Sequence, residues 1–247
     1  MSITKFIITT IYLFFLSTFV ANAELSLKEE ALIQNQIRDY ILQNPEIIIE
    51  SMQRYEQKRL NQALKNDKNL IIKNFNELTN DKLSYAVGDQ NSALALVVFI
   101  DYKCGYCKKS LEELFELVAE NPKLRLIIKE FPILGAESLL ASKASIALFL
   151  NQGPLLYEKF IKYLVKHRGE ITRDKIIQII TSIGGDTSEF EKKMDQEVIY
   201  NVLNSNYALA NSLKISGTPT FIIGTEVIRG YKEKKMLQAL LDKNIKN

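Results

Sequence analysis

The chain has two cysteines, Cys104 and Cys107, which lie three positions apart in the segment YKCGYCKKS at Tyr102–Ser110. Two thiols at this spacing could form a stabilising disulfide, bind a metal, or exchange disulfides with other molecules. A stabilising disulfide is disfavoured, because the entropy that it removes from the unfolded chain grows with the length of the loop that it closes. The spacing therefore favours chemistry at the two sulfurs.

Metal binding is the main alternative for these cysteines. A tetrahedral zinc site takes four ligands, usually Cys or His, and His167 is the only histidine in the sequence. We therefore expect no structural metal and no other cofactor. Two thiolates could hold copper(I), which prefers soft sulfur ligands, so a copper(I)-binding or client-binding protein with an incidental dithiol is the alternative function.

The elements around the cysteines favour a redox dithiol. The apolar run LALVVFI at 94–100 predicts a strand in the centre of a sheet, and the apolar positions after Ser110 predict a helix. Cys104 would then lie where the helix begins, next to unpaired backbone N–H groups and the positive end of the helix dipole. Nearby lysines at 103, 108 and 109 add positive charge. This setting favours a thiolate at Cys104.

The two cysteines are therefore expected to have different roles. We expect Cys104 to be the exposed sulfur that attacks a disulfide. Cys107, one turn further into the helix, is expected to be buried and to resolve the mixed disulfide. Such exchange needs no cofactor.

A second segment, SGTPT at Ser216–Thr220, precedes a predicted strand. Pro219 could simply be a proline at a strand entry, which is common. It could instead form a cis Thr218–Pro219 bond that leaves backbone groups free to pair with an extended substrate. The presence of both this proline and the dithiol favours the second interpretation, with Thr218 and Pro219 as substrate-binding residues.

The order of predicted elements defines an α/β fold. The strand at 94–100, a helix and a second strand at 124–131 form a right-handed parallel unit. An all-helical insertion at about 133–213 follows, and a hairpin and a final helix at 231–243 end the chain. The insertion shows four helical patterns, at 137–150, 155–166, 172–183 and 187–209, and the hairpin strands lie at 220–224 and 226–230.

The segment at 24–80 is predicted to be helical, with a break at NPE (Asn44–Glu46) because the residue before a proline avoids the helical region. Its apolar stripe could pack on the catalytic domain, predicted at 81–247, or pair with the same segment of another subunit. We favour pairing, and so a homo-oligomer. The residues at 80–93 are predicted to be a linker. The stripe comprises Ile48, Met52, Tyr55, Leu60, Ala63 and Leu64.

The N-terminus predicts export. Lys5, an apolar run at Phe6–Val20 and the small residues ANA are typical of a secretory signal peptide, here residues 1–23. The run is shorter than the roughly 20 apolar residues of a membrane-spanning helix. The ending NIKN is not an endoplasmic-reticulum retention signal, so we expect the bacterial periplasm. Cleavage would leave 31 basic and 29 acidic residues, interspersed along the chain, which predicts no nucleic-acid partner.

Three motifs in order, VVFIDYKCGYCKK, IIKEFPILG and GTPTFIIG, resemble those of DsbA-like periplasmic thiol-disulfide oxidoreductases of the thioredoxin superfamily. The segment Ile37–Met52 also resembles the oligomeric subgroup that includes the suppressor-of-copper-sensitivity proteins. The resemblance implies a thioredoxin-like fold with a helical insertion and an N-terminal helical extension. It also implies that Cys104 is the nucleophile, Cys107 the resolving cysteine, and Pro219 a cis-proline facing them.

The dipeptide between the cysteines, Gly105–Tyr106, departs from the proline and histidine of the strongest oxidases in this family. The resemblance therefore implies a less oxidising dithiol, closer to the disulfide isomerases, with Gly105 and Tyr106 contacting substrate. We expect the chain to form or isomerise disulfides in cysteine-containing exported proteins. A membrane protein is a candidate redox partner for the dithiol.

A second departure concerns the acid that handles the resolving thiol's proton in many relatives. Six residues before Cys104 the chain has Val98 instead of that acid. Asp101, Glu130 or a chain of water molecules could take its place.

Overall fold

A computed structural model describes residues 26–245 of the chain, so the predicted signal peptide at 1–23 lies outside the described residues. The chain divides into two units, residues 1–59 and 60–247. Among the described residues, no helix is both long and apolar enough to span a membrane.

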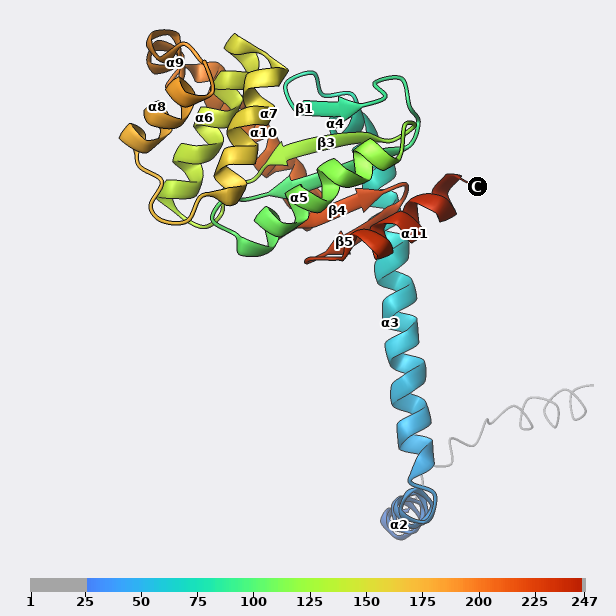
Figure 1. Cartoon of the computed structure of the whole chain (residues 1–247). Helices are drawn as coiled ribbons and strands as arrows, with labels where there is room; N and C mark the ends of the chain where they lie inside the picture. The colour runs from blue at the N-terminus through green and yellow to red at the C-terminus, as the bar shows by residue number, and fades with distance from the viewer. Residues whose placement is uncertain (1–25, 246–247) are drawn as a thin grey trace, which may run out of the picture. The chain divides into compact units, whose positions relative to one another are not determined.

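The second unit contains a five-stranded sheet in the order β1-β3-β2-β4-β5 (Figure 1). Its central strand pairs in parallel with β3 and antiparallel with β4, and the remaining pairs are antiparallel. The prediction of a central strand followed by a parallel partner and a C-terminal hairpin is confirmed. The strands are β1 (Tyr85–Gly88), β2 (Ala95–Ile100), β3 (Arg125–Glu130), β4 (Thr220–Ile223) and β5 (Glu226–Arg229).

The edge strand β1 corrects the expectation of a linker at 80–93. It has only four residues and no apolar alternation long enough to be recognised, but it pairs with β3 from Tyr85↔Ile128 to Gly88↔Arg125. The Tyr85 ring is buried and stacks on the Tyr157 ring at 4.4 Å between centroids. Contacts distant in sequence therefore determine this strand.

Successive residues of β2 face two different hydrophobic clusters, as the twofold side-chain repeat of a strand requires. Val98 and its even-numbered neighbours pack in the cluster that includes α5 (Gly105–Glu120) and α11 (Lys234–Ile245). Val97 and Phe99 face the cluster on the other side, which includes Leu209 and Ala210 of the last helix before β4. Burial on both faces explains why the strand is almost uncharged.

Five helices lie between β3 and β4, where four were expected. The first four gather at one end of the unit (Figure 1), and the last contributes Leu209 to the cluster that faces Val97. The expected helix at 187–209 is two helices, because the buried positions change phase. Phe190 and Met194 are buried and lie four residues apart. A continuous helix would bury Val198 next, but Val198 is exposed and Ile199 is buried instead. The five are α6 (Ala136–Gln152), α7 (Pro154–Lys166), α8 (Arg173–Ser182), α9 (Thr187–Lys193) and α10 (Glu197–Ser212).

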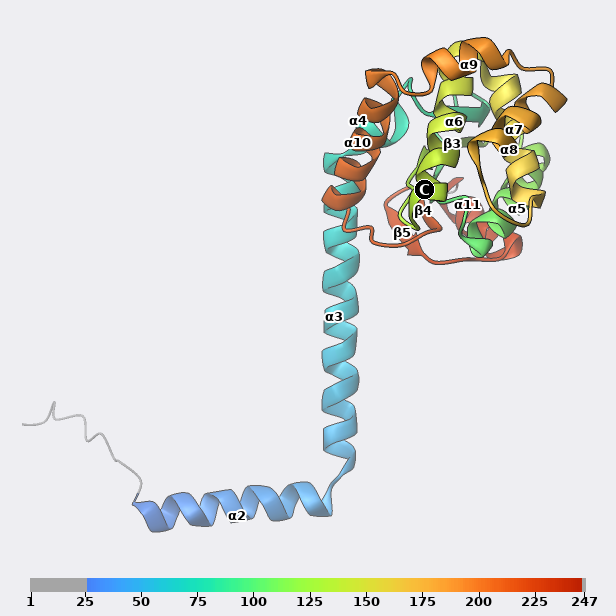
Figure 2. The same cartoon turned by 90° about the vertical axis from the view of Figure 1, so that its left-hand side faces the viewer.

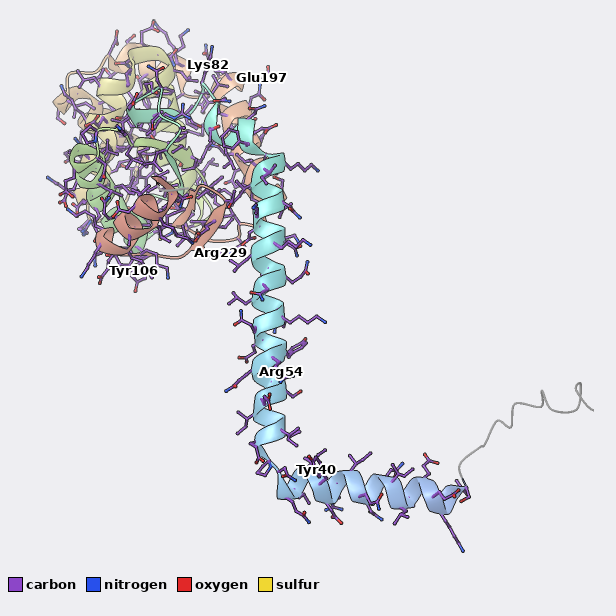
Figure 3. All side chains as sticks on the ribbon, turned by 90° about the vertical axis from the view of Figure 1, so that its right-hand side faces the viewer. Tyr40, Arg54, Lys82, Tyr106, Glu197 and Arg229 are labelled. Atoms are coloured by element: carbon purple, nitrogen blue, oxygen red, sulfur yellow. The ribbon has the colours of Figure 1, made fainter. Side chains whose placement is uncertain are left out.

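The first unit consists of α2 (Leu27–Gln43) and the beginning of α3 (Glu46–Lys73). Ser26 and Glu29 form a capping box at the start of α2, and the helix ends just before Pro45, as expected. None of the residues of α2 is buried. Figure 3 shows side chains projecting outward along both helices, including Tyr40 and Arg54.

The second unit begins at Leu60, whereas the catalytic domain was expected to begin at residue 81. The difference arises because Ile71 of α3 and Leu78 of α4 (Phe75–Thr79) are buried in the same cluster as Leu209. Figure 2 shows α4 beside α10, within this unit. Asp67 of α3 also pairs with Arg229 of β5 at 2.8 Å. The C-terminal part of the predicted N-terminal segment is therefore part of the sheet-containing unit.

Candidate active site

The two cysteines lie at the start of α5, directly after the central strand. Cys104 is the N-cap residue in an extended conformation, and Cys107 is one turn further along the helix. Both are free thiols. Cys104 is partly exposed, whereas Cys107 is fully buried among apolar residues.

The environment of Cys104 favours its thiolate. Its pKa is lowered to about 6, mainly because the Cys107 thiol donates a hydrogen bond to its sulfur, with further help from the N–H groups of Cys107 and Tyr106. Cys104 Sγ lies 3.4 Å from the carbonyl oxygen of Thr218. In its protonated form the thiol can donate a hydrogen bond to this oxygen. At neutral pH Cys104 is therefore available as a nucleophile.

Cys107 has the opposite environment. Burial raises the pKa of its thiol far above the ordinary value, and the neighbouring Cys104 raises it further. Its sulfur accepts a hydrogen bond from the backbone N–H of Asp101 at 3.5 Å. At neutral pH Cys104 is therefore a thiolate and Cys107 a protonated thiol, and a hydrogen bond joins the two sulfurs.

The Ser216–Thr220 segment lies next to Cys104 and has the expected conformation. The Thr218–Pro219 bond is cis, and Thr218 is the residue whose carbonyl contacts Cys104. The Pro219 carbonyl accepts from Gly230 N–H at 2.9 Å, which fixes the segment to the end of β5. Apart from its chain neighbours and the nearby backbone of α5, no atom lies within 4 Å of a Cβ atom added to Gly105, so the surface beside Cys104 is open.

Tyr106 lies at the surface of the second unit (Figure 3), with 64% of its side chain exposed. Its ring stacks on Tyr231, with centroids 5.7 Å apart. Tyr231 donates its hydroxyl to Glu113 at 2.6 Å, and Lys109 Nζ lies 4.5 Å from its ring centroid. No sequence pattern pointed to Tyr231, because it comes from the far end of the chain.

The other two lysines near Cys104 bind the helical insertion. Lys103 Nζ pairs with Glu137 of α6 at 2.8 Å, and the same carboxylate accepts from the N–H of Ile171. Lys108 Nζ donates to the carbonyl oxygen of His167 at 2.8 Å. His167, the only histidine of the chain, is the C-cap of α7.

Val98, which replaces the acid found in many relatives, is fully buried. Of the two acids predicted to take over its role, Asp101 is the nearer in sequence. The Asp101 carboxylate accepts four hydrogen bonds, from the backbone N–H groups of Lys103, Ile133 and Leu134 and from the hydroxyl of Ser138. Three of these four partners are amide N–H groups, which can only donate. Asp101 therefore joins the end of β2 to the loop before α6.

Glu130, at the end of β3, has a different set of partners. Its carboxylate accepts from the hydroxyls of Tyr102 at 2.6 Å, Tyr157 at 2.9 Å and Ser142 at 2.7 Å. Burial raises its pKa to about 7 against the opposing effect of these hydroxyls. Hydroxyls can donate or accept, so this network can hold the carboxyl in either protonation state. Among the described residues no hydrogen bond joins either acid's carboxylate to Cys107, and the acceptor of its proton stays a prediction.

Comparison with known proteins identifies the family of this fold and site. The thioredoxin family model matches residues 79–243, about two thirds of the chain, and the chain belongs to this family. The N-terminal domain of the copper resistance protein ScsC matches residues 29–61. Together with the structural neighbours, these matches support the DsbA-like ScsC subgroup.

Three solved structures illustrate the likeness. The thiol-disulfide exchange protein alpha-DsbA2 of Wolbachia pipientis is 28% identical, with 72% of this chain and 95% of that chain covered and a TM-score of 0.68. ScsC of Proteus mirabilis in a transitional conformation is 25% identical (90% and 98% covered, TM-score 0.65). A periplasmic thioredoxin-like protein of Salmonella enterica serovar Typhimurium is 28% identical (70% and 96% covered, TM-score 0.65).

A curated relative shares only part of its length with this chain. The Na⁺/H⁺ antiporter NhaA of Herminiimonas arsenicoxydans is 22% identical over 162 residues, which are 65% of this chain and 25% of that protein. The chain therefore spans about a quarter of the length of this relative.

Proposed function

We propose that the chain is an exported protein thiol-disulfide oxidoreductase that forms or isomerises disulfides in cysteine-containing proteins. The Cys104 thiolate attacks a client disulfide, one client sulfur leaves as a thiolate, and a mixed disulfide forms. Cys107 then loses its proton and attacks Cys104, which releases the second client sulfur and leaves a Cys104–Cys107 disulfide. The reverse sequence introduces a disulfide into a reduced client.

One observation carries this proposal, namely the contrast between the two sulfurs. A partly exposed Cys104 with a pKa of about 6 and a buried Cys107 with a raised pKa divide the attacking and resolving steps between two positions. Membership of the thioredoxin family and the likeness to a thiol-disulfide exchange protein support the same chemistry.

The substrate-binding residues of this proposal surround Cys104. Thr218 supplies backbone groups for an extended client, and the cis bond at Pro219 holds that segment beside the sulfur. The open surface at Gly105 gives the client access to the sulfur. Tyr106 supplies an exposed ring beside them.

Two assays on one sample test the proposal: oxidation of a reduced client protein and refolding of a client with scrambled disulfides. We expect the wild-type chain to accelerate both, and both Cys104→Ser and Cys107→Ser to abolish turnover. If the wild-type chain accelerates neither reaction, the proposed function is wrong.

We further propose that the chain acts as a homo-oligomer in the periplasm. The match to the ScsC N-terminal domain covers the helices whose apolar residues are exposed. Assembly would let two or more dithiols face a shared space, where one misfolded client is held while its disulfides are rearranged. Export is supported by the likeness to a periplasmic thioredoxin-like protein. A membrane redox partner would recharge the dithiol.

A further inference from the structure

Two cationic side chains converge on one backbone oxygen near the dithiol. Lys108 Nζ donates to the carbonyl oxygen of His167 at 2.8 Å, and Arg168 Nη1 donates to the same oxygen at 3.2 Å. The two nitrogens are therefore at most about 6 Å apart. Arg168 Nη1 also donates to the carbonyl of Val165 at 2.8 Å.

Neither of these two cations is neutralised by a carboxylate within the described part of the chain. The nearby Lys103 is paired with Glu137, but neither Lys108 nor Arg168 forms an ion pair with any residue from 26 to 245. The pKa of Lys108 is lowered by partial burial and by repulsion from Arg168 and Lys103. Two like charges held this close are stabilised by an anion placed between them.

One member of the pair, Lys108, lies one helical turn after the nucleophile. Lys108 belongs to the first turn of α5, and its backbone N–H donates to the carbonyl of Cys104 at 3.1 Å. Arg168 lies in the connection between α7 and α8 and is exposed, while Lys108 is partly exposed. A molecule of peptide size bound to Cys104 through sulfur would extend along this turn of α5 to reach these side chains.

We propose that Lys108 and Arg168 form an anion subsite that binds a carboxylate of the disulfide attacked by Cys104. This inference rests on the proposed function. In the step that it assists, the Cys104 thiolate bonds to one sulfur of an acidic disulfide while the other sulfur leaves as a thiolate, so no further oxidant is needed. The carboxylate belongs to an acidic residue near a client cysteine or to an acidic tripeptide thiol such as glutathione.

The first experiment measures the rate at which the reduced full-length chain reacts with three small disulfides: anionic glutathione disulfide, neutral bis(hydroxyethyl) disulfide and cationic cystamine. We expect the rate ratio of the anionic to the neutral disulfide to fall about two- to fivefold in Lys108→Gln and in Arg168→Gln, and the cystamine ratio to rise. Added salt should reduce the wild-type preference. The neutral disulfide corrects for any change in the reactivity of the Cys104 sulfur.

Lys123→Gln is the matched control, since it removes the same charge from an exposed lysine beyond the other end of α5. An equal change of ratio in this control, or an unchanged ratio in both test variants, would overturn the subsite. The proposed function fails separately, if the wild-type chain does not react with the neutral disulfide.

A second experiment distinguishes the two sources of the carboxylate. Disulfide-linked peptides that differ only in Glu, Gln or Lys two residues from the cysteine are compared with glutathione disulfide. A client source predicts that Lys108 and Arg168 discriminate among the peptides, and a tripeptide source predicts discrimination for glutathione disulfide alone. The absence of discrimination in both arms contradicts the proposal.

Discussion

Cys104 and Cys107 carry the same thiol group, but one helical turn gives them opposite proton affinities. The exposed N-cap sulfur accepts hydrogen bonds from Cys107 and from backbone N–H groups, whereas the second sulfur is buried in the hydrophobic core. The reduced protein therefore has one thiolate near the surface, at Cys104, and one buried protonated thiol, at Cys107. The hydrogen bond between the two sulfurs, the backbone N–H groups at the start of the helix and the burial of Cys107 produce this difference.

Alkylation of the reduced protein should therefore report the thiolate of Cys104. We expect the rate to rise with pH around a midpoint of about 6, and to be nearly constant above neutral pH, because only the thiolate reacts. In Cys107→Ala the midpoint should be higher, since the main hydrogen-bond donor is lost. A wild-type midpoint near 9, the ordinary value of a thiol, would contradict this description of the site.

Glu130 should make stability depend on pH. Its pKa is about 7 in the folded chain and 4.5 without burial, so the folded state holds the proton more tightly. Stability is therefore expected to fall by about 3 kcal/mol as pH rises from about 4.5 to 7, and then to level off. Urea unfolding across this range should show that fall in the wild-type chain and lack it in Glu130→Gln.

Glu158→Gln is the control, because Glu158 also accepts from a tyrosine hydroxyl, that of Tyr85, but is paired with Lys162 at the surface. Its pKa is lowered, mainly by the hydrogen bond of Lys162 against the effect of burial. The fall between pH 4.5 and 7 should therefore persist in this variant. A wild-type chain whose stability rises over that interval would show that Glu130 is ionised in the folded state.

The sequence could predict that the cysteines and Pro219 form a candidate site, because that prediction needs only residue types and their spacing. It could not identify Tyr231 beside Tyr106, or the two side chains on the His167 carbonyl, because these contacts join segments far apart in the chain. The sequence also could not show which groups surround the carboxylates of Asp101 and Glu130. Their partners, amide groups for one and hydroxyls for the other, are visible only in the folded chain.

At the scale of the secondary-structure elements, hydrogen bonds to the Asp101 carboxylate stabilise the connection between β2 and α5. In Asp101→Asn the side-chain amide would face at least one backbone N–H that now donates to the carboxylate. A buried donor without an acceptor costs about 1–3 kcal/mol. We therefore expect a loss of that size in urea unfolding at neutral pH.

Asp89→Asn is the matched control for this change. Asp89 accepts a backbone hydrogen bond from Asn91 within a surface turn, so the effect should stay within about 0.5 kcal/mol. Equal losses in the two variants would show that Asp101 has no special role at the end of β2.

Element prediction succeeded where the local pattern was long and failed where distant contacts decided. The apolar run that forms β2, the helix after Cys104 and the β4–β5 hairpin were all predicted, since their periodicity or turn residues are local. The strand β1 was missed because its four residues depend on pairing with β3. The division between α9 and α10 was missed because it is a shift in which residues face the core.

For the protein as an assembly, the exposed apolar residues of the N-terminal helices require an explanation. Ile48 and Met52 are 46% and 58% exposed, and Tyr55 is 63% exposed. Pairing with the same segment of another subunit would bury them. The double variant Ile48→Glu/Met52→Glu of the mature chain should therefore be a monomer by light scattering, while the mature wild-type chain scatters as an oligomer.

Gln53→Glu, which adds a charge on the same helix at an exposed polar position, should leave the assembly intact. We expect the monomeric double variant to retain simple disulfide exchange and to lose most of its activity toward scrambled clients. A wild-type monomer would remove the assembly, and a monomeric variant with full isomerase activity would show that the assembly has no part in the chemistry.

Capture of the mixed disulfide is the decisive test of whether Cys104 attacks and Cys107 resolves. Each single serine variant is incubated with a disulfide-bonded client, and the covalent complex is measured on a non-reducing gel. We predict that Cys107→Ser accumulates the complex, because attack proceeds while release is blocked, and that Cys104→Ser forms none. Equal trapping by the two variants, or trapping only by Cys104→Ser, would contradict the assignment of roles.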